Sequence, residues 1–414
     1  MKKSKAIIPL WLAVFTDLVG FGIVLPVLPG LFLDPTSGIL PFGTSQLVRA
    51  VLLGALLALF PLIQMFSAPM LGALADRHGR KPILLLSFLG TLVGYVLFAV
   101  GIMTGQLWLL IVGRVIDGAT GGNISVAQAS IADLSTERTR AKYFGLIGMA
   151  FGLGFIIGPF LGGKLSDPSV LPWFNYATPF WFAAVLCALN VILLLTLLPE
   201  TLKERIVRPV TMLTGIRNVR LAFTLPRLRL LFFVNFLLML GFTVYTSYFQ
   251  VYLISRFNMP TSAIGTLFGF TGLCIALSQG LIAGPVSNRV PPNAILRSTI
   301  FGAAVTIALT LYPSAPSGLY LVIPFMAVFQ GLVTPNITAL ISSQADAESQ
   351  GEILGINQSV SSFAQFLPGF FGGAAAAWYA GLPTWIAAGL TFIAGIVFLI
   401  GYKDTQEKRF RETS

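Results

Sequence analysis

Charge is the first thing this sequence has little of. Only 10% of its 414 residues are Asp, Glu, Lys or Arg, whereas soluble domains carry about 25%. Hydrophobic residues make up 56% of the chain, so a water-soluble fold would have too few charged side chains to cover its surface. The composition excludes an ordinary soluble domain and predicts an all-α polytopic membrane protein.

Histidine and cysteine are also scarce. The single histidine, His78, lies in a charged loop, and Cys187 and Cys274 lie in separate apolar runs. This excludes a disulfide framework, and we expect neither a metal site nor a bound cofactor. The chain also lacks a G-x-x-x-x-G-K-S/T phosphate loop and a histidine–carboxylate cluster, which argues against an enzyme. A membrane sensor is equally disfavoured, because no soluble domain is appended.

The formal net charge is +11, but the basic residues lie in short patches between apolar runs. No basic stripe or basic domain is present, so we expect no nucleic-acid partner. All but four of the 26 Lys and Arg fall on one side of the membrane if the N-terminus is cytoplasmic. Since cytoplasmic loops are enriched in Lys and Arg, both termini are predicted to be cytoplasmic.

Long apolar runs are abundant, and a membrane span needs about 20 such residues. The first run is too long for a signal peptide and is expected to remain as a span. Twelve candidate spans can be counted: 6–30, 46–70, 82–103, 107–132, 143–165, 178–198, 230–254, 262–286, 295–312, 318–342, 352–376 and 382–402.

The longest connection between spans, residues 199–229, divides them into two sets of six. We therefore predict an N-terminal six-helix bundle over 1–198 and a C-terminal one over 230–402, with a cytoplasmic tail over 403–414. The connection itself is basic and is expected to lie on anionic headgroups; the alternative is a regulatory or partner-binding role.

The two sets of spans look like diverged repeats. GATGGNISVAQASIAD at 118–133 is echoed by GLVTPNITALISSQAD at 331–346, and GPFLGG at 158–163 by PGFFGG at 368–373. Ordered echoes at a nearly constant offset predict two similar bundles with a path for a solute between them.

Three ionisable residues lie deep inside spans: Asp17 in the first, and Arg114 and Asp117 in the fourth. A charge at the bilayer centre costs about 2.5–3.5 kcal/mol, so such residues usually face a bundle interior or a wet cavity. Their three-residue spacing places Arg114 and Asp117 on one helix face. We interpret the group as a proton-coupling site in which an acid carries the proton and Arg114 tunes it. The alternative is a structural ion pair between spans 1 and 4.

A charged turn, LGALADRHGRKP, follows the second span. Its glycines permit a tight turn, and its charged residues can pair with groups at other helix ends. We expect a cytoplasmic gate that forms in one conformation and breaks in another, although a static positive anchor is the alternative. Its members within the turn are Gly72, Asp76, Arg77, Gly79, Arg80 and Lys81.

This turn resembles the loop 2–3 signature of the major facilitator superfamily, which implies twelve spans in two six-helix bundles. The resemblance also implies that Asp133, the acid at the end of span 4, joins the gate. The span 5 sequence, with Gly154, Gly158, Pro159, Gly162 and Gly163, resembles the signature of the drug:proton antiporter branch. The N-terminal half, including TDLVGFGIVLPVLP, is most similar to the tetracycline-exporter group. That group carries acids in spans 3 and 9 and a histidine in span 8, and none stands at those positions here.

The span 5 glycines recur at four-residue spacing, which lets helix backbones approach closely. With Pro159 they predict a hinge or a sealing contact between the bundles, against the alternative of ordinary tight packing. Polar and aromatic residues in spans 1, 4, 7, 10 and 11 are the candidates for a substrate cavity: Phe21, Asn123, Tyr245, Gln250, Gln330, Asn336 and Asn357. The polar residues of the second half are equally suited to helix–helix hydrogen bonds.

The resemblance implies a proton-coupled antiporter that exports amphipathic organic compounds by alternating access. It also implies a monomer in the plasma membrane, expected to be a bacterial inner membrane, with the proton as coupling ion and a small molecule and lipid as partners. The alternative is a proton-coupled or facilitative transporter that moves one metabolite, such as a siderophore, sugar or amino-acid derivative, inward or outward.

Overall fold

The computed structural model describes residues 2–135, 137–202, 211, 214–226, 228–287, 289–344 and 350–402, and this part of the chain is helical without strands. The first half contains α1 (Lys2–Leu33), α2 (Gln46–His78), α3 (Arg80–Thr104), α4 (Leu107–Ala119), α5 (Asn123–Leu134), α6 (Glu137–Leu165) and α7 (Thr178–Leu197). The second half contains α9 (Arg229–Phe257), α10 (Thr261–Leu277), the π-helical turn η1 (Ser278–Ala283), α11 (Gly284–Ser287), α12 (Pro292–Leu309), α13 (Pro316–Ser343), α14 (Gln350–Phe366), α15 (Pro368–Trp378) and α16 (Leu382–Gly401).

Nine helices in the described residues are long and apolar enough to cross a membrane. Other predicted spans are built from pieces: 107–132 is divided into α4 and α5, and 352–376 into α14 and α15. The predicted span 143–165 lies within α6. The polytopic helical fold is confirmed, although these interruptions leave fewer uninterrupted spans than twelve.

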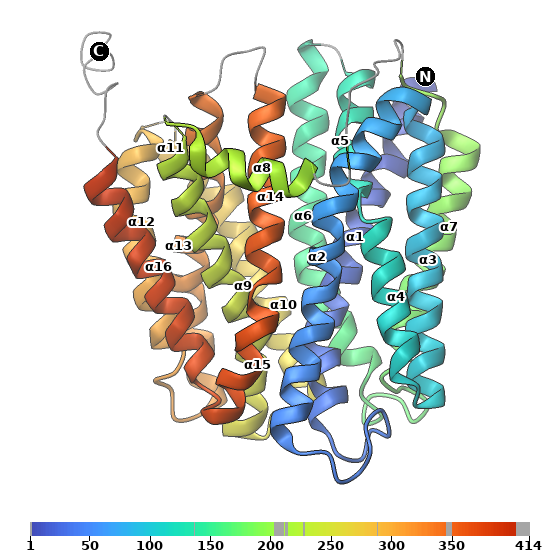
Figure 1. Cartoon of the computed structure of the whole chain (residues 1–414), viewed down its shortest axis with the longest axis vertical. Helices are drawn as coiled ribbons and strands as arrows, with labels where there is room; N and C mark the ends of the chain where they lie inside the picture. Colours follow the sequence, from blue (N-terminus) through green and yellow to red (C-terminus); the bar gives the residue numbers. More distant parts are fainter. Residues whose placement is uncertain are drawn as a thin grey trace.

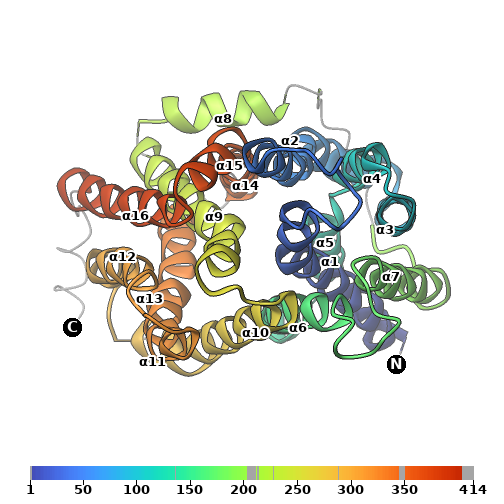
Figure 2. The same ribbon diagram turned by 90° about the horizontal axis from the view of Figure 1, so that it is seen from below.

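The two halves stand side by side, with α2 beside α15 and α6 beside α10 (Figures 1 and 2). We call the end where α1 begins and α16 ends the basic end, because the Arg77–Lys81 turn also lies there; the other is the opposite end (Figure 1). The largest buried apolar cluster belongs mainly to the first half and two others mainly to the second, although Tyr248, Val251 and Ala376 join the first and Leu25 joins one of the others. The tail over 403–414 lies outside the described residues.

A short helix, α8 (Thr214–Thr224), occupies part of the predicted 199–229 linker. It lies crosswise to the long helices on the side of the molecule (Figure 1). Its sequence carries no long apolar run, so it does not qualify as a span. The predicted linker therefore contains a defined helix that hydropathy alone did not reveal.

Arg49, at the start of α2, fixes the connection between α1 and α2 at the opposite end. It is fully buried, and its guanidinium donates to four carbonyl oxygens, those of Phe32, Asp34, Pro41 and Thr44, at 3.1–3.3 Å. A buried charge needs such a complete set of partners. This side chain therefore stabilises the loop rather than taking part in the site described next.

Candidate functional site

The three predicted ionisable residues lie together inside the first half. Arg114 and Asp117 are buried on α4, and their Nη1 and Oδ2 atoms are 3.7 Å apart. Asp17 on α1 is half-buried, and its Oδ1 accepts a hydrogen bond of 3.0 Å from the Nδ2 of Asn123. Asp117 lies near enough to Asp17 for their charges to repel. The cluster therefore holds two carboxylates and one guanidinium.

The interruption between α4 and α5 positions this cluster. Residues 120–122 are not helical, so α5 starts afresh at Asn123, whose amide reaches Asp17. Two α2 side chains bond the freed carbonyls: Ser67 Oγ donates to Gly118 O at 2.6 Å, and Gln64 Nε2 donates to Gly121 O at 2.7 Å. Irregular backbone is tolerated inside a membrane only where the protein supplies such partners.

Arg114 lies between two aromatic rings rather than in a tight ion pair. Its guanidinium carbon is 5.7 Å from the ring centre of Phe60 and 5.2 Å from that of Phe98. Both distances are in the range of cation–π attraction. Its Nε is buried without a hydrogen-bond partner. A loosely held guanidinium of this kind can respond to a change in the charge of Asp117.

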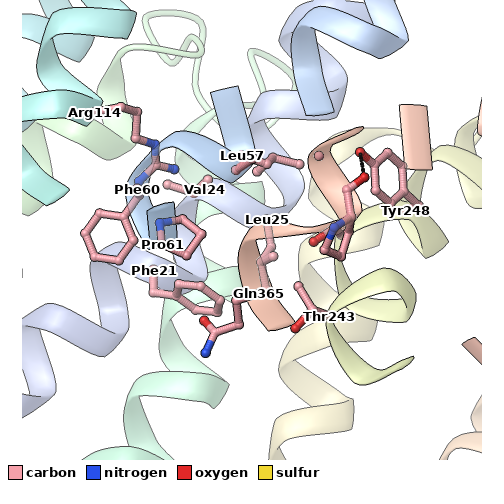
Figure 3. A pocket seen from close by; sticks show the side chains of 14 residues that line it. Phe21, Val24, Leu25, Leu57, Phe60, Pro61, Arg114, Thr243, Tyr248 and Gln365 are labelled. Carbon is pink, nitrogen blue, oxygen red and sulfur yellow. Dashed lines mark hydrogen bonds between the residues drawn. The ribbon is translucent and has the colours of Figure 1, made fainter. Parts of the chain in front are cut away.

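A cavity lies between the two halves next to Arg114 (Figure 3). Its lining is mostly apolar, and Arg114 is the only charged residue in it. The second half contributes polar groups from α9 and from the α14–α15 region. The lining residues are Phe21, Val24, Leu25, Leu57, Ala58, Phe60, Pro61, Arg114, Thr243, Ser247, Tyr248, Gln365, Pro368 and Gly369.

Of the predicted cavity residues, Phe21 alone lines this cavity. Asn123 bonds Asp17, Asn357 accepts from Asn235 at 2.9 Å, and Asn336 donates to the carbonyl of Leu332 on its own helix at 2.7 Å. Tyr245, Gln250 and Gln330 are buried within the second half. The predicted helix–helix alternative thus describes Asn123 and Asn357 but not Asn336, and sequence reasoning missed Thr243, Ser247 and Gln365.

The predicted gate residues form a charge cluster at the basic end. Arg80 Nη1 lies 2.7 Å from Asp76 Oδ1, and Arg80 Nε lies 3.1 Å from Asp133 Oδ2. Gly79 makes the turn at φ +112°, a conformation that favours glycine. A Cβ on Gly72 would meet nothing within 4 Å, and Arg77 is exposed. Arg80 is therefore the centre of this cluster.

Glu200 joins this charge cluster, and the sequence motif did not identify it. Its carboxylate accepts the backbone N–H groups of Arg80 at 2.9 Å and Lys81 at 3.3 Å. Lys81 Nζ in turn donates to the carbonyl of Leu195 at 2.9 Å. An acid that binds the first N–H groups of a helix is stabilised by the helix dipole. The only feature of the sequence that pointed to Glu200 was its position just after the sixth predicted span.

We expect Arg80→Gln to slow transport roughly tenfold, because Asp76 and Asp133 would lose their shared cation. Hydrogen bonds to charged groups contribute about 1.5–3 kcal/mol, so their loss changes a conformational equilibrium by an order of magnitude. Initial transport rates in proteoliposomes measure the effect, with Arg77→Gln as the matched control because Arg77 is exposed. Equal rates for both variants would contradict a role for the Arg80 cluster.

The span 5 glycines face two different helices. Three of them face α1. A Cβ on Gly154 would lie within 3 Å of Leu18, and one on Gly162 within 3 Å of Ile23. A Cβ on Gly158 would lie within 3 Å of both Val19 and Gly22. A Cβ on Gly163 would instead lie 2.6 Å from the Thr261 carbonyl and 2.8 Å from the Gly265 Cα on α10. The four-residue stripe therefore packs α6 inside the first half, and Gly163 makes one of the close contacts between the halves. Pro159 lies within the continuous helix α6.

A polar contact accompanies Gly163 at the opposite end. The carboxylate of Asp167, just after α6, bonds the hydroxyl of Ser262 at the start of α10, and Tyr176 bonds Thr261. Burial raises the pKa of Asp167, but bonds from Ser262 and Ser169 and the nearby charge of Lys164 outweigh it, so the net pKa is lowered. The two halves are thus joined at this end by an ionised acid.

This lowered pKa predicts that the Asp167 contact is insensitive to pH between 8 and 5. A carboxylate with a depressed pKa gives its full stabilisation above its ordinary pKa, near 4, and loses it only as pH falls through the lowered value. We expect the difference in melting temperature between wild type and Asp167→Asn to be the same at pH 8 and pH 5. A difference that vanishes at pH 5 would contradict the assignment.

Comparisons with known proteins agree with this geometry. A family model, the Major Facilitator Superfamily, matches residues 10–369. The tetracycline resistance protein, class C, of Escherichia coli is 34% identical over 358 residues, which cover 86% of this chain and 85% of that protein. The class G protein of Vibrio anguillarum is 33% identical over 363 residues, 85% of each chain.

The fold is also that of a solved transporter. The crystal structure of the human organic anion transporter MFSD10 superposes with a TM-score of 0.70 at 22% identity, covering 96% of this chain and 100% of that one. At this identity the likeness concerns the fold. With the family match and the apolar helices, it shows that the chain is a multi-pass membrane transporter, not an enzyme, and that it belongs to the major facilitator superfamily.

Proposed function

We propose that this transporter is a proton-coupled antiporter that exports amphipathic organic compounds. The observation that carries the proposal is the buried Asp17–Asp117–Arg114 cluster, which meets the cavity between the halves at Arg114. The relatives named for tetracycline resistance support the export of drugs.

The cluster suits proton exchange because its charge is uncompensated. Two carboxylates and one guanidinium carry a net charge of −1 when both acids are ionised. Their proton affinity depends on hydration and on the distance to Arg114, and both change when the halves move. One proton moving inward yields roughly 2.3 kcal/mol per 100 mV, enough for about a 50-fold concentration of a neutral substrate.

The cavity suits an amphipathic solute. Phe21, Leu25, Leu57 and Phe60 offer apolar contacts, and the hydroxyl and amide groups of the second half can orient a polar end. A neutral or cationic solute is favoured beside a cluster of net negative charge. Protonation of the cluster removes that charge, so proton and cation compete for the site, which is the thermodynamic requirement for exchange.

We further infer that the basic end is cytoplasmic, which places both termini on the cytoplasmic side of a bacterial inner membrane. The close contacts of Gly163 and Asp167 then lie on the outer side. Domains 1–198 and 230–402 move against each other about this site, and the protein works as a monomer. The proton is the coupling ion, and no other cofactor is needed.

Reconstitution in liposomes with an imposed pH gradient tests the proposal. Ethidium and tetracycline serve as probes while internal pH is recorded. We expect substrate movement against its gradient with proton flux in the opposite direction. Flux in the same direction would overturn antiport, and substrate movement without proton flux would indicate facilitative transport of a metabolite-like solute.

A further inference from the structure

The crosswise helix α8 passes over the boundary between the two halves. Figure 2 shows it along the outer edge of the molecule, running past α9 and α15 toward α2. Its contacts are with α14 and α9 of the second half and with α2 of the first. Any separation of α2 from α14 would therefore break contacts that α8 makes with one of them.

Contacts with the second half fix α8 in place. Ala222 is fully buried in the apolar cluster of that half. The Asn218 amide donates to Ser359 Oγ on α14 at 3.3 Å. The Phe223 ring packs edge-to-face against the rings of Phe233 and Phe236 on α9, with centroids 6.3 and 6.1 Å away. The helix therefore travels with the second half.

A close backbone contact ties α8 to the first half. Gly215 is buried, and a Cβ added to it would collide with the backbone carbonyl of Met65 on α2. Such an approach needs a glycine, because any side chain would push the two backbones apart. This contact is the one that breaks when α2 moves away from α14.

The outward side of α8 is divided into two flanks. At 100° per residue, Arg217 and Arg220 share one flank, while Ile216 and Phe223 share the other. Ile216 and Phe223 are 47% and 37% exposed. Neither arginine makes an ion pair within the described part of the chain. A basic flank beside an apolar flank is the pattern of a helix that lies in a membrane interface.

We propose that α8 is an interfacial strap that binds anionic lipid headgroups through Arg217 and Arg220 and holds α2 against α14. Anionic lipid then favours the conformation seen here, and release of Gly215 from Met65 accompanies the change to the other one. The strap concerns the balance between conformations and depends on neither the substrate nor the coupling ion.

Electron-paramagnetic-resonance distances between spin labels test the strap in the whole protein. Gly72 on α2 and Gly355 on α14 suit the labels, since a Cβ at either meets nothing within 4 Å. The two positions are changed to cysteine after Cys187→Ala and Cys274→Ala. Distances are recorded in phosphatidylcholine nanodiscs with and without phosphatidylglycerol. We expect phosphatidylglycerol to raise the population with the present separation roughly fivefold to tenfold.

Two variants separate lipid binding from the contact with α2. Arg217→Gln with Arg220→Gln removes exposed side chains only, and we expect it to abolish the lipid dependence. Arg297→Gln, an exposed arginine on α12, is the matched control and should retain it. Gly215→Val should shift the distances in both lipids. Retained lipid dependence in the double variant, or unchanged distances in Gly215→Val, would overturn the proposal. Because the readout is a distance, the result is independent of whether protons are exchanged.

Discussion

Asp17→Asn is expected to abolish uphill export, reducing the substrate ratio across the membrane to unity from about tenfold per pH unit, the limit for one proton exchanged against one monovalent cation. Asparagine keeps the size of the side chain and can still bond Asn123, but it has no titratable group. The measurement is accumulation of ethidium driven by a pH gradient in proteoliposomes. Downhill movement of the same solute should persist, because the cavity beside Phe21 is unchanged.

Asp34→Asn is the matched control for this variant. Asp34 follows α1 directly, and its side chain caps its own turn by accepting from Thr36 at 2.6 and 2.8 Å. It is an acid near the same helix but outside the cluster, so we expect uphill export to be retained. If Asp17→Asn and Asp117→Asn both kept proton-driven accumulation, the cluster would not be the coupling site.

Asp117→Asn alone is a less selective change. It would leave Arg114 buried near two aromatic rings without its nearest carboxylate. Removing one partner of a buried pair costs about 3–5 kcal/mol, so we expect a lower melting temperature as well as lost coupling. The double variant Arg114→Gln with Asp117→Asn should recover stability without coupling, which separates the structural role from the chemical one.

Gly163→Val is expected to reduce the transport rate more than tenfold. Its side chain would collide with the Thr261 carbonyl and the Gly265 Cα, so α6 and α10 could not close at the opposite end. Overpacking of this kind costs about 1–3 kcal/mol, which shifts the equilibrium toward the conformation open on that side. Initial rates of ethidium transport measure the effect.

Gly389→Val provides the control, because a Cβ at Gly389 on α16 meets nothing within 4 Å. It adds the same side chain to another long apolar helix and should transport at the wild-type rate. A normal rate for Gly163→Val would mean that closure between α6 and α10 is not required for transport.

The apolar runs and sparse charge of the sequence determined that the chain forms membrane-crossing helices, because such runs have no other favourable environment. The same pattern located Asp17, Arg114 and Asp117, since an ionisable residue inside a span is conspicuous. It also located Asp76 and Arg80 of the basic-end cluster, because their i,i+4 spacing sets the ion pair, whereas Asp133 was expected only from the family resemblance.

The tertiary structure alone decided which groups meet between helices. The echo between 118–133 and 331–346 predicts similar roles for Asn123 and Asn336, yet one bonds Asp17 and the other its own helix. The difference arises because span 4 is interrupted, with Gln64 and Ser67 of α2 satisfying its carbonyls, whereas α13 is continuous. Such partners depend on how neighbouring helices are rotated and how closely they approach, which the hydropathy of one helix does not specify. For the same reason Glu200, Gln365 and the separate partners of Gly162 and Gly163 emerged only from the folded chain.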